Sequence, residues 1–408
     1  MWAVTPWPVG LGWSGNLSSR LVGKSFAIHA LNRTERSLNA PDVAVYYFPS
    51  YHREPRNDGW YYPGFTEWDL VAAGRPRFEG HHQPLRPQWG FFDESVPEIM
   101  KRSCDAAAAH GIDAFLFDWY WYDSMPFLNG ALDRGYLGLD APKVKFAVMW
   151  ANHHWQDVFP ARLERDDAGR ELKQWTPATV SAEEFVSLSD DWIRHYFSHP
   201  RYWRIDGGAY VSFFAMELFS EWMGGDEATR EVLEDFRHRS RAAGTGELHL
   251  AIPGGLKLDA GDDRIARLGL DSHTSYNWLG ELPRDRGMQV PYSDWRAAGQ
   301  ASWPERAKAS RVPYGPNVTM GWDSTTRVHP DDENVIGEWP FLPVVVDNTP
   351  DEFGDSIAKA AAFSRAHPNS AGYITINAWN EWTEGSYLEP EATTGMAYLE
   401  QLRRGLGE

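Results

Sequence analysis

Cysteine is almost missing from this chain of 408 residues, because Cys104 is its single example. One thiol cannot form a disulfide within the chain, and it cannot supply the thiolates of a cysteine-based zinc site. Cys104 lies in an alanine-rich stretch of helical character, residues 94–110, and free cysteines are usually buried. We therefore expect a buried structural thiol.

Long apolar runs are also missing. No stretch approaches the roughly 20 apolar residues that a membrane-spanning helix needs, and the mean hydropathy is −0.51. Residues 1–19 lack a basic segment followed by an unbroken apolar one, so they do not indicate a signal peptide. We expect no membrane partner and a cytoplasmic location, with another export route left open.

Positive charge is scarce. Lys and Arg number 39 against 57 Asp and Glu, for a formal net charge of −18. Such a surface repels phosphates, so nucleic acid and anionic membranes are not expected partners. Strongly anionic polysaccharides are disfavoured too, unless the cleft is locally basic.

Nucleotide and metal signatures are weak or absent. No Asp-x-Asp or P-loop occurs, and the single Gly-x-Gly-x-x-Gly match, residues 10–15, follows no predicted strand. The loop histidines are individually weak metal-ligand candidates. We therefore predict no cofactor and no metal site.

Aromatic residues are abundant, with 21 Trp, 17 Tyr and 20 Phe. Some must fill the core, but many stand beside polar residues, as in 119–123, 150–155 and 276–278. Rings mixed with polar groups suit a cleft with an apolar floor and a few hydrogen-bonding groups. Sugars, with apolar C–H faces and hydroxyl rims, match such a cleft, so an oligosaccharide or polysaccharide is the expected partner.

The segment at residues 373–385 carries the strongest chemical signal. A β-branched run leads into Glu381 and Glu384, which stand among tryptophans. Paired carboxylates beside aromatic faces are typical of enzymes that move protons on a sugar. The acid of such a pair must hold its proton near neutral pH, and Trp379 and Trp382 could supply the apolar wall that this requires. A structural role for either glutamate, paired with an arginine or starting a helix, is the less favoured reading.

Predicted strands and helices alternate along the chain. Strands are expected at 43–48, 114–119, 144–150, 209–214, 248–252, 270–276, 317–320 and 373–377, and the run 344–346 competes for the seventh place. Helices are expected at 94–110, 182–197, 227–243, 262–268, 294–310 (interrupted at Pro304), 353–366 and 395–406. Such alternation predicts parallel strands with helical crossovers.

Eight such units predict an α/β fold of the (β/α)8 TIM-barrel type with long βα loops. An open, doubly wound sheet is the alternative. The expected domains are an irregular N-terminal extension over 1–40 and a catalytic barrel over 41–408.

Barrel enzymes place their chemistry at the carboxyl ends of the strands, and six predicted strands end in polar and aromatic residues. Glu381 and Glu384 are the catalytic candidates. Loop anchoring is an equal alternative for Glu67. For Asp118 a role in the cleft is favoured, with internal barrel hydrogen bonding close behind, and loop capping is the alternative for Asp323. The substrate-binding candidates are Tyr46, Tyr51, His52, Glu67, Trp68, Asp118, Trp119, Trp121, Trp150, Asn152, His153, Tyr276, Trp322, Asp323, Asn380 and Trp382.

Seven sequence blocks, at residues 57–68, 78–84, 117–122, 149–152, 321–323, 377–385 and 387–390, occur in this order. Together they resemble the glycoside hydrolase family 99-like proteins, including their WbsX-like group. The resemblance covers about residues 43–388 and is specific for the superfamily, which includes endo-α-mannosidases. It implies a (β/α)8 barrel.

The resemblance also implies a mechanism. Glu381 would act as base on the sugar's own 2-hydroxyl, giving a 1,2-anhydro intermediate, and Glu384 would protonate the leaving oxygen. Configuration would be retained without a covalent glycosyl-enzyme. Thr383, between Trp382 and Glu384, differs from the mannosidases, so the sugar, the linkage, and exo or endo action stay open.

The leading hypothesis is therefore a retaining glycoside hydrolase acting on an α-linked glycan, with a role in polysaccharide degradation. The alternatives are a glycosyltransferase of surface-polysaccharide assembly and a non-catalytic carbohydrate-binding barrel.

Overall fold

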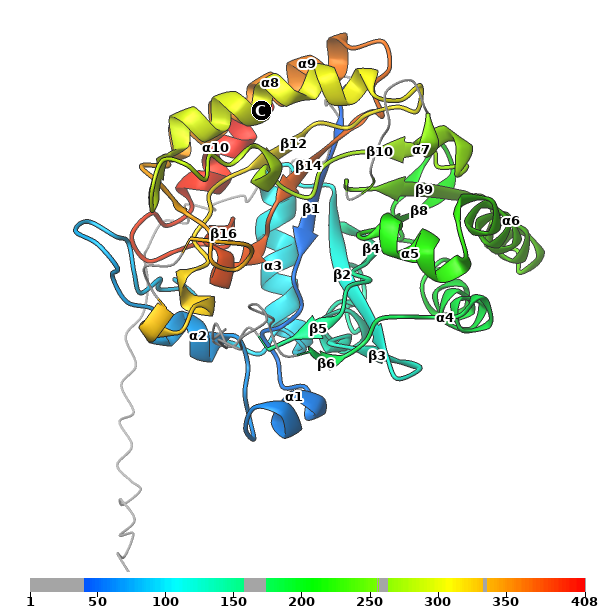
Figure 1. Cartoon of the computed structure of the whole chain (residues 1–408), viewed down its shortest axis with the longest axis horizontal. Coiled ribbons are helices and arrows are strands. Elements are labelled where there is room, and N and C mark those ends of the chain that lie inside the picture. The colour runs from blue at the N-terminus through cyan, green and yellow to red at the C-terminus, as the bar shows by residue number, and fades with distance from the viewer. Residues whose placement is uncertain (1–39, 158–173, 255, 257–262, 333–335, 408) are drawn as a thin grey trace, which may run out of the picture. The chain divides into compact units, whose positions relative to one another are not determined.

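Eight parallel strands form the centre of the fold (Figure 1). The computed structural model describes residues 40–157, 174–254, 256, 263–332 and 336–407. The predicted extension over 1–40 lies outside them, apart from Ala40. The strands are β1 (Asp42–Tyr47), β2 (Ala114–Tyr122), β4 (Lys145–Trp150), β8 (Gly208–Phe213), β9 (Leu248–Ile252), β10 (Ser272–His273), β12 (Asn317–Thr319) and β14 (Tyr373–Asn377).

The strands follow one another around the sheet in chain order. Each pairs in parallel with its neighbour from β1 to β10, and β14 lies between β12 and β1, where Val43 faces Ile374. Between β10 and β12 the ladder is reduced to an isolated parallel bridge from His273 to Tyr314. The predicted (β/α)8 architecture is thus confirmed as curled parallel strands in an α/β fold, with a seam between β10 and β12.

The strands are buried on both sides. Every residue of β2, β8 and β14 is buried, which is typical of parallel strands covered by helices on one side and by barrel contents on the other. Polar groups inside the barrel find partners there, for example Thr274 Oγ1 at 2.8 Å from Thr375 Oγ1.

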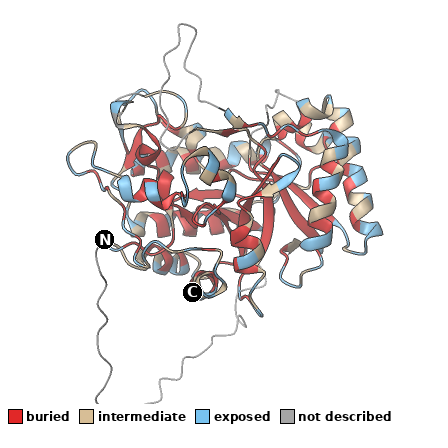
Figure 2. Ribbon diagram, turned by 90° about the horizontal axis from the view of Figure 1, so that it is seen from below, coloured by how far each residue is buried: buried red, intermediate tan, exposed pale blue. Residues whose placement is uncertain are grey.

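Helices cover the outside of the strands, with their buried faces toward the core and exposed faces toward solvent (Figure 2). Two of them begin at side-chain caps, Ser181 for α4 and Thr349 for α9. These outer helices are α3 (Pro97–Ala109), α4 (Ala182–His195), α6 (Asp226–Ala242), α8 (Tyr292–Lys308), α9 (Pro350–Ala366) and α10 (Ala397–Gly405).

Shorter elements build the connections. The helices are α1 (Pro55–Trp60), α2 (Trp68–Ala73), α5 (Met216–Met223), α7 (Arg264–Arg267) and a π-helical stretch, Ala131–Tyr136. Strand β3 (Met125–Phe127) pairs with β2, and β7 (Arg204–Ile205) pairs with β8. Three two-stranded sheets join β5 (Trp155–Gln156) to β6 (Gln174–Thr176), β11 (Gln289–Pro291) to β13 (Val344–Val346), and β15 (Asn380–Glu381) to β16 (Ser386–Tyr387).

Two sequence predictions need correction. The run Val344–Val346 does not compete for a barrel position, because it pairs with Gln289–Pro291 outside the barrel. Pro304 does not interrupt α8, which runs through it. Pro304 is exposed while its neighbour Trp303 is buried, so packing holds the helix and solvent can satisfy the carbonyl that loses its partner.

Cys104 is buried on α3, as expected, and burial raises the pKa of its thiol to about 12. In the described part of the chain, no helix combines the length and apolar character needed to cross a membrane.

Candidate active site

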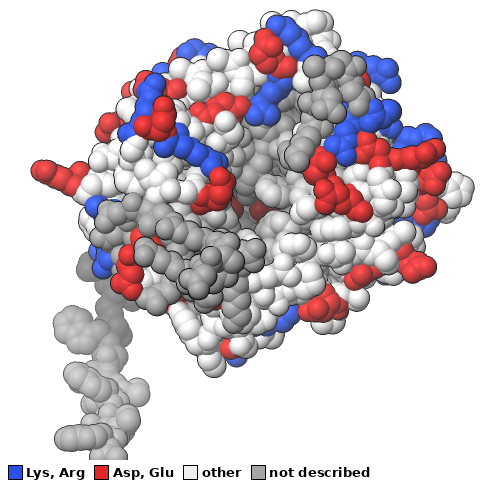
Figure 3. All heavy atoms as spheres, in the orientation of Figure 1, with Lys and Arg blue, Asp and Glu red and all other residues white. Residues whose placement is uncertain are grey.

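A cavity of about 760 Å³ lies at the carboxyl ends of the barrel strands. The face in Figure 3 is hollowed near its centre, with acidic and basic side chains interspersed around the hollow. Every strand of the barrel contributes to the wall, β2 from within the strand and the others just after their carboxyl ends, through residues that include Phe48, Asp118, His153, Phe214, Pro253, Tyr276, Trp322 and Glu381.

Glu381 and Glu384 both line this cavity. Glu381 ends β15, and Glu384 lies in the following 3-10 turn, so two residues, Trp382 and Thr383, lie between them in a tight bend. The bend closes at Gly385, whose φ of +64° is in the region that favours glycine. Asp323 N–H donates to the carbonyl of Glu384 at 2.6 Å, which fixes the turn against the loop that follows β12.

Glu381 is 4 % exposed and lies beside a hydroxyl and a guanidinium. The Tyr276 hydroxyl is 3.1 Å from Glu381 Oε1, and Arg327 Nη2 is 3.6 Å from Oε2. Burial raises the pKa of Glu381 well above its usual value, and the nearby Glu384 carboxyl raises it further, while Arg327 opposes the shift.

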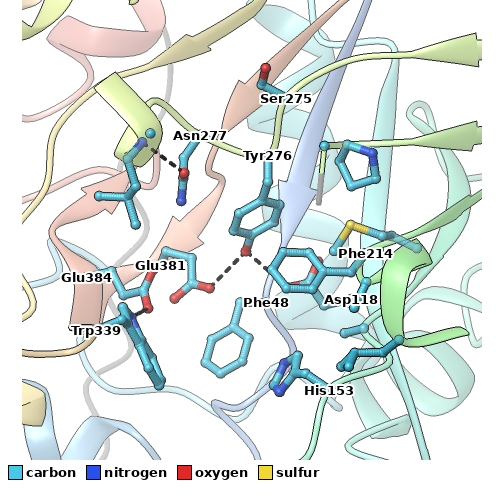
Figure 4. A pocket seen from close by; sticks show the side chains of 18 of the residues that line it. Phe48, Asp118, His153, Phe214, Ser275, Tyr276, Asn277, Trp339, Glu381 and Glu384 are labelled. Carbon is cyan, nitrogen blue, oxygen red and sulfur yellow. Dashed lines mark hydrogen bonds between the residues drawn. The ribbon is translucent and has the colours of Figure 1, made fainter. Parts of the chain in front are cut away.

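Glu384 is 6 % exposed and has a different neighbour. Trp339 Nε1 donates to Glu384 Oε1 at 2.9 Å, and Arg327 Nε is 3.6 Å from the same oxygen. Burial raises the pKa of Glu384, opposed by Arg327 and by the indole hydrogen bond. Figure 4 shows the two glutamates reaching toward separate partners, Tyr276 and Trp339.

Arg327 connects both glutamates to a third carboxyl. Its Nη1 donates to Glu67 Oε1 at 3.1 Å, and its Nη2 is 3.1 Å from Glu67 Oε2, which also accepts from the Thr383 hydroxyl. Burial raises the pKa of Glu67 to about 7, against the lowering effect of Arg327. Although burial disfavours its charge, Arg327 keeps a raised pKa because of Glu67, Glu384 and Glu381. Glu67 therefore lies behind the cavity wall and fixes the position of Arg327 through this ion pair.

Asp118 lies on β2 at the opposite side of Tyr276 from Glu381. The Tyr276 hydroxyl is 3.1 Å from Asp118 Oδ2, and both contacts are drawn in Figure 4. Burial raises the pKa of Asp118 well above its usual value. Within the described residues, Asp118 Oδ1 is buried and has no hydrogen-bond partner.

Several predicted binding residues support the site from behind. The Tyr46 hydroxyl donates to the Ser275 carbonyl at 3.3 Å, and its ring packs on Tyr276. Tyr51 Oη accepts from the Trp382 N–H at 3.1 Å, and its ring packs on Trp68.

His52 and Asn380 belong to a buried layer around Glu94. His52 Nδ1 is 3.0 Å from Glu94 Oε1. The Asn380 amide bonds to both the N–H and the carbonyl of Phe48, each at 2.8 Å. This layer ties the end of β1 to the segment that carries the two glutamates.

Other predicted residues lie in the surrounding core. Trp119 Nε1 donates to the Tyr196 hydroxyl, and Trp121 Nε1 donates to Glu184. Trp150 packs among the rings on α4 and α5, and Asn152 bonds the backbone of Ala215. These four residues are not among those that line the cavity, whereas His153 and Trp322 are.

Asp323 also lies outside the cavity wall. It accepts hydrogen bonds from His81, Gln83 and Thr325, and these donors lower its pKa despite its burial. Asp323 thus anchors the loop after β12.

The proposed wall of Trp379 and Trp382 needs correction. Both indoles point to another acid, because Trp379 Nε1 donates to Glu389 at 2.9 Å and Trp382 Nε1 at 2.7 Å. Burial raises the pKa of Glu389 to about 8. The indole that contacts a cavity glutamate is instead Trp339.

The sequence reasoning missed Arg327, Trp339 and the cavity rings Phe48, Tyr120 and Phe214. Arg327 carried a usable signal, because it is the basic residue closest after the predicted seventh strand. Trp339 carried none, since it lies far from any predicted strand end. Among the residues that the structure describes, no three His, Cys, Asp or Glu side chains are grouped so that they could hold a metal ion.

Comparisons with solved structures agree with the barrel. A glycoside hydrolase-like protein matches with a TM-score of 0.58 and 15% identity, over 90% of this chain and 94% of its own. The GH99 endo-alpha-mannosidase from Bacteroides thetaiotaomicron matches with a TM-score of 0.53 and 15% identity, over 90% and 96%. At these identities the likeness shows a shared fold.

Sequence comparisons identify the family. The uncharacterized protein WxcX of Xanthomonas campestris pv. campestris, in strains B100 and ATCC 33913, is 27% identical over 380 residues, which is 89% of this chain and 49% of the relative. The chain thus spans about half the length of these curated relatives. The sequence model of the family described as "Glycosyltransferase WbsX" matches residues 43–402. The chain therefore belongs to this WbsX family, as its sequence motifs predicted, and it shares its fold with the GH99 endo-alpha-mannosidase.

Proposed function

We propose that this protein is a retaining glycoside hydrolase that acts on an α-linked glycan through a 1,2-anhydro sugar intermediate. The observation that carries the proposal is the pair Glu381 and Glu384. Two buried carboxyls with different neighbours face a cavity large enough for sugar rings, at the barrel end where such enzymes place their chemistry.

In the first step, Glu381 accepts the proton of the sugar's 2-hydroxyl, and that oxygen forms a bond to the anomeric carbon. The bond from this carbon to the leaving oxygen breaks, and Glu384 gives that oxygen its proton. In the second step, water attacks the anomeric carbon and the bond from this carbon to O2 breaks. Glu384 takes the water proton, and Glu381 returns its proton to O2. Two inversions give net retention.

The surroundings of the pair support this division. Burial raises the pKa of both carboxyls, and the Glu384 carboxyl raises that of Glu381 further, so one proton between them is favoured over two negative charges. Tyr276 and Arg327 stabilise a charged Glu381, the form that a base needs. The Trp339 indole stabilises the charge that Glu384 acquires after it donates its proton.

The cavity lining favours an uncharged sugar ring beside the glutamates. Phe48, Tyr120, Phe214 and Trp322 offer apolar surfaces to C–H faces. The acids near the reacting position would repel a uronic acid there, because Arg327, the cation beside them, already contacts three carboxyl groups.

The direct test is turnover on a panel of α-linked oligosaccharides and polysaccharides by the wild type, Glu381→Gln and Glu384→Gln. We expect a glycan that the wild type cleaves, and a loss of about 10²–10⁴-fold in each variant. Glu305→Gln, which removes an exposed carboxyl on α8 that pairs with Lys308, is the matched control. Wild-type turnover in both site variants would refute the assignment.

The intermediate can be tested separately. NMR of the first-formed product should show the anomeric configuration of the substrate. A 2-deoxy-2-fluoro analogue of the cleaved substrate lacks the attacking hydroxyl, so it should be neither turned over nor attached to the protein. Mass spectrometry that found a glycosyl adduct on Glu381 or Glu384 would favour a covalent mechanism instead.

The description of the matched family favours a second candidate, a glycosyltransferase. A transferase should be stabilised against heat by a nucleotide sugar and not by oligosaccharides, whereas the proposed hydrolase should show the reverse. Tight glycan binding by calorimetry without any product would instead indicate a carbohydrate-binding barrel.

A further inference from the structure

The hydroxyl of Tyr276 lies between two buried carboxyls that come from different parts of the barrel. It is 3.1 Å from Asp118 Oδ2 on β2 and 3.1 Å from Glu381 Oε1 after β14. The Tyr276 ring is itself fixed, because it packs against Tyr46 and Phe214. The hydroxyl therefore cannot move toward one carboxyl without leaving the other (Figure 4).

A phenol has a single proton to donate. If both carboxyls were charged, one of them would face the tyrosine oxygen across 3.1 Å without a hydrogen bond. If one carboxyl is neutral, it donates to the tyrosine oxygen, and the tyrosine donates to the other. The second arrangement satisfies all three groups, so geometry favours one neutral and one charged carboxyl.

The charged groups nearby decide which carboxyl is neutral. Around Glu381 lie the Arg327 guanidinium at 3.6 Å, the acids Glu67 and Glu384, and the hydroxyl of Tyr51. A cation thus supports negative charge on Glu381.

Asp118 has no comparable support in the described residues. The groups that act on it are the Tyr276 hydroxyl and the Glu384 carboxyl, and the hydroxyls of Tyr46 and Tyr120 also lie near it. His153, across the cavity wall, is neutral near pH 7 because burial lowers its pKa. Burial raises the pKa of Asp118 and of Glu381 alike, so burial does not choose between them. The Arg327 guanidinium lies beside Glu381, and Asp118 is therefore the carboxyl that stays neutral.

We propose that Asp118 is a protonated positioning residue, which donates its proton to the Tyr276 oxygen and so directs the Tyr276 hydroxyl at the Glu381 carboxylate. This role rests on the proposed function, since it keeps Glu381 charged and hydrogen-bonded as a base must be. Reversal of the chain, with Tyr276 donating to Asp118, would leave Glu381 protonated and unable to accept the 2-hydroxyl proton.

The protonation state can be measured without any substrate. Infrared difference spectra at pH 7 should show that Asp118→Asn removes one carboxylic-acid C=O band from the protein. Asp323→Asn is the matched control, because Asp323 is an equally buried aspartate surrounded by donors and is charged. Its replacement should remove a carboxylate band and no carboxylic-acid band. An Asp118→Asn spectrum that resembles the control would overturn the proposal.

A second variant tests the direction of the chain and does not depend on the folding of Asp118→Asn. The signal of Glu381 in an infrared pH titration is identified by its loss in Glu381→Gln. In Tyr276→Phe its midpoint should move upward by about one pH unit, because the charged form loses a hydrogen bond. An unmoved midpoint would mean that Tyr276 donates to Asp118, and the proposal would fail.

The infrared results separate this proposal from the proposed function. If the spectra behave as expected but no glycan is cleaved, the hydrogen-bond chain stands and the hydrolase assignment fails. If a glycan is cleaved, Asp118→Asn should lose less kcat/KM than Asp118→Leu, because an amide N–H can still donate to Tyr276. Equal losses in the two variants would contradict a donor role for Asp118.

Discussion

Replacing Arg327 with methionine removes the guanidinium that contacts Glu67, Glu381 and Glu384 at 3.1–3.6 Å. The side chain is 3 % exposed, so solvent cannot take its place. Breaking a buried ion pair from one side costs about 3–5 kcal/mol, because the remaining charge is left without compensation. We expect a loss of this size in the free energy of unfolding at pH 8.

The same substitution should cost less at pH 5. Even with Arg327 present, the pKa of Glu67 is about 7, above its usual value of 4.5, and without Arg327 it would be higher. At pH 5 the carboxyl is neutral, so the loss falls to the missing hydrogen bonds, about 1–2 kcal/mol.

The wild type should show the corresponding trend with pH. Because the folded-state pKa of Glu67 is raised, its contribution to stability is fully present below about pH 4.5. It is lost as pH rises through 7, by about 3 kcal/mol.

Urea unfolding at pH 5 and pH 8 measures these differences. Arg296→Met is the matched control, since Arg296 pairs with Asp355 and Glu352 on the outer surface. It should cost at most about 1 kcal/mol, equally at both pH values, because the pKa of Asp355 is lowered and its carboxylate stays charged. The double variant Arg327→Met/Glu67→Gln should recover about 1–3 kcal/mol of the loss at pH 8. Equal losses at the two pH values, or no recovery in the double variant, would refute the reasoning.

Three further predictions concern the neighbours of the site. Trp339→Phe removes the hydrogen bond that lowers the pKa of Glu384, so this pKa should rise. The alkaline limb of the kcat/KM profile should then move to higher pH, and a move to lower pH would contradict the role of Glu384 as the acid. Gly385→Ala places a Cβ 2.7 Å from the backbone nitrogen of Asp323 at a φ of +64°, and should lower stability by about 1–3 kcal/mol together with turnover, as thermal unfolding and activity assays would show. Glu389→Gln removes a carboxyl whose pKa is raised to about 8. The wild type should lose stability as pH rises from 5 to 8 and the variant should not, so the unfolding free energy of the variant should gain up to about 4 kcal/mol relative to the wild type. A difference between the two proteins that stays constant with pH would argue against a neutral Glu389.

The barrel could be predicted because each long strand is an apolar run with a clear boundary. Residues 114–119, 209–214 and 373–377 lie within strands or end one residue past them. Short strands were harder to predict. Within the predicted strand 270–276, only Ser272–His273 forms a strand. Asp271 and Thr274 still bond to β9 carbonyls, while Tyr276 bonds to Pro253 beyond that strand and lines the cavity, which apolar patterning alone does not reveal.

Within the site, residues near a strand end could be predicted, and those that arrive through tertiary packing could not. Glu381, Glu384 and Tyr276 each follow a recognisable strand, and Asp118 lies within one. Trp339 reaches Glu384 from a loop between β12 and β13. The sequence also could not show which tryptophans point away from the cavity, because side-chain direction depends on partners such as Glu389.

The paired hydrogen bonds between Asn380 and Phe48 join residues that are 332 positions apart. They complete the contact between the first barrel strand and the last, so the two glutamates gain their surroundings only when the ring of strands closes. Such distant pairing is slow compared with helix formation. During refolding, activity should return after the helical signal has formed. The interval between these two events would measure how long the final closure of the barrel takes.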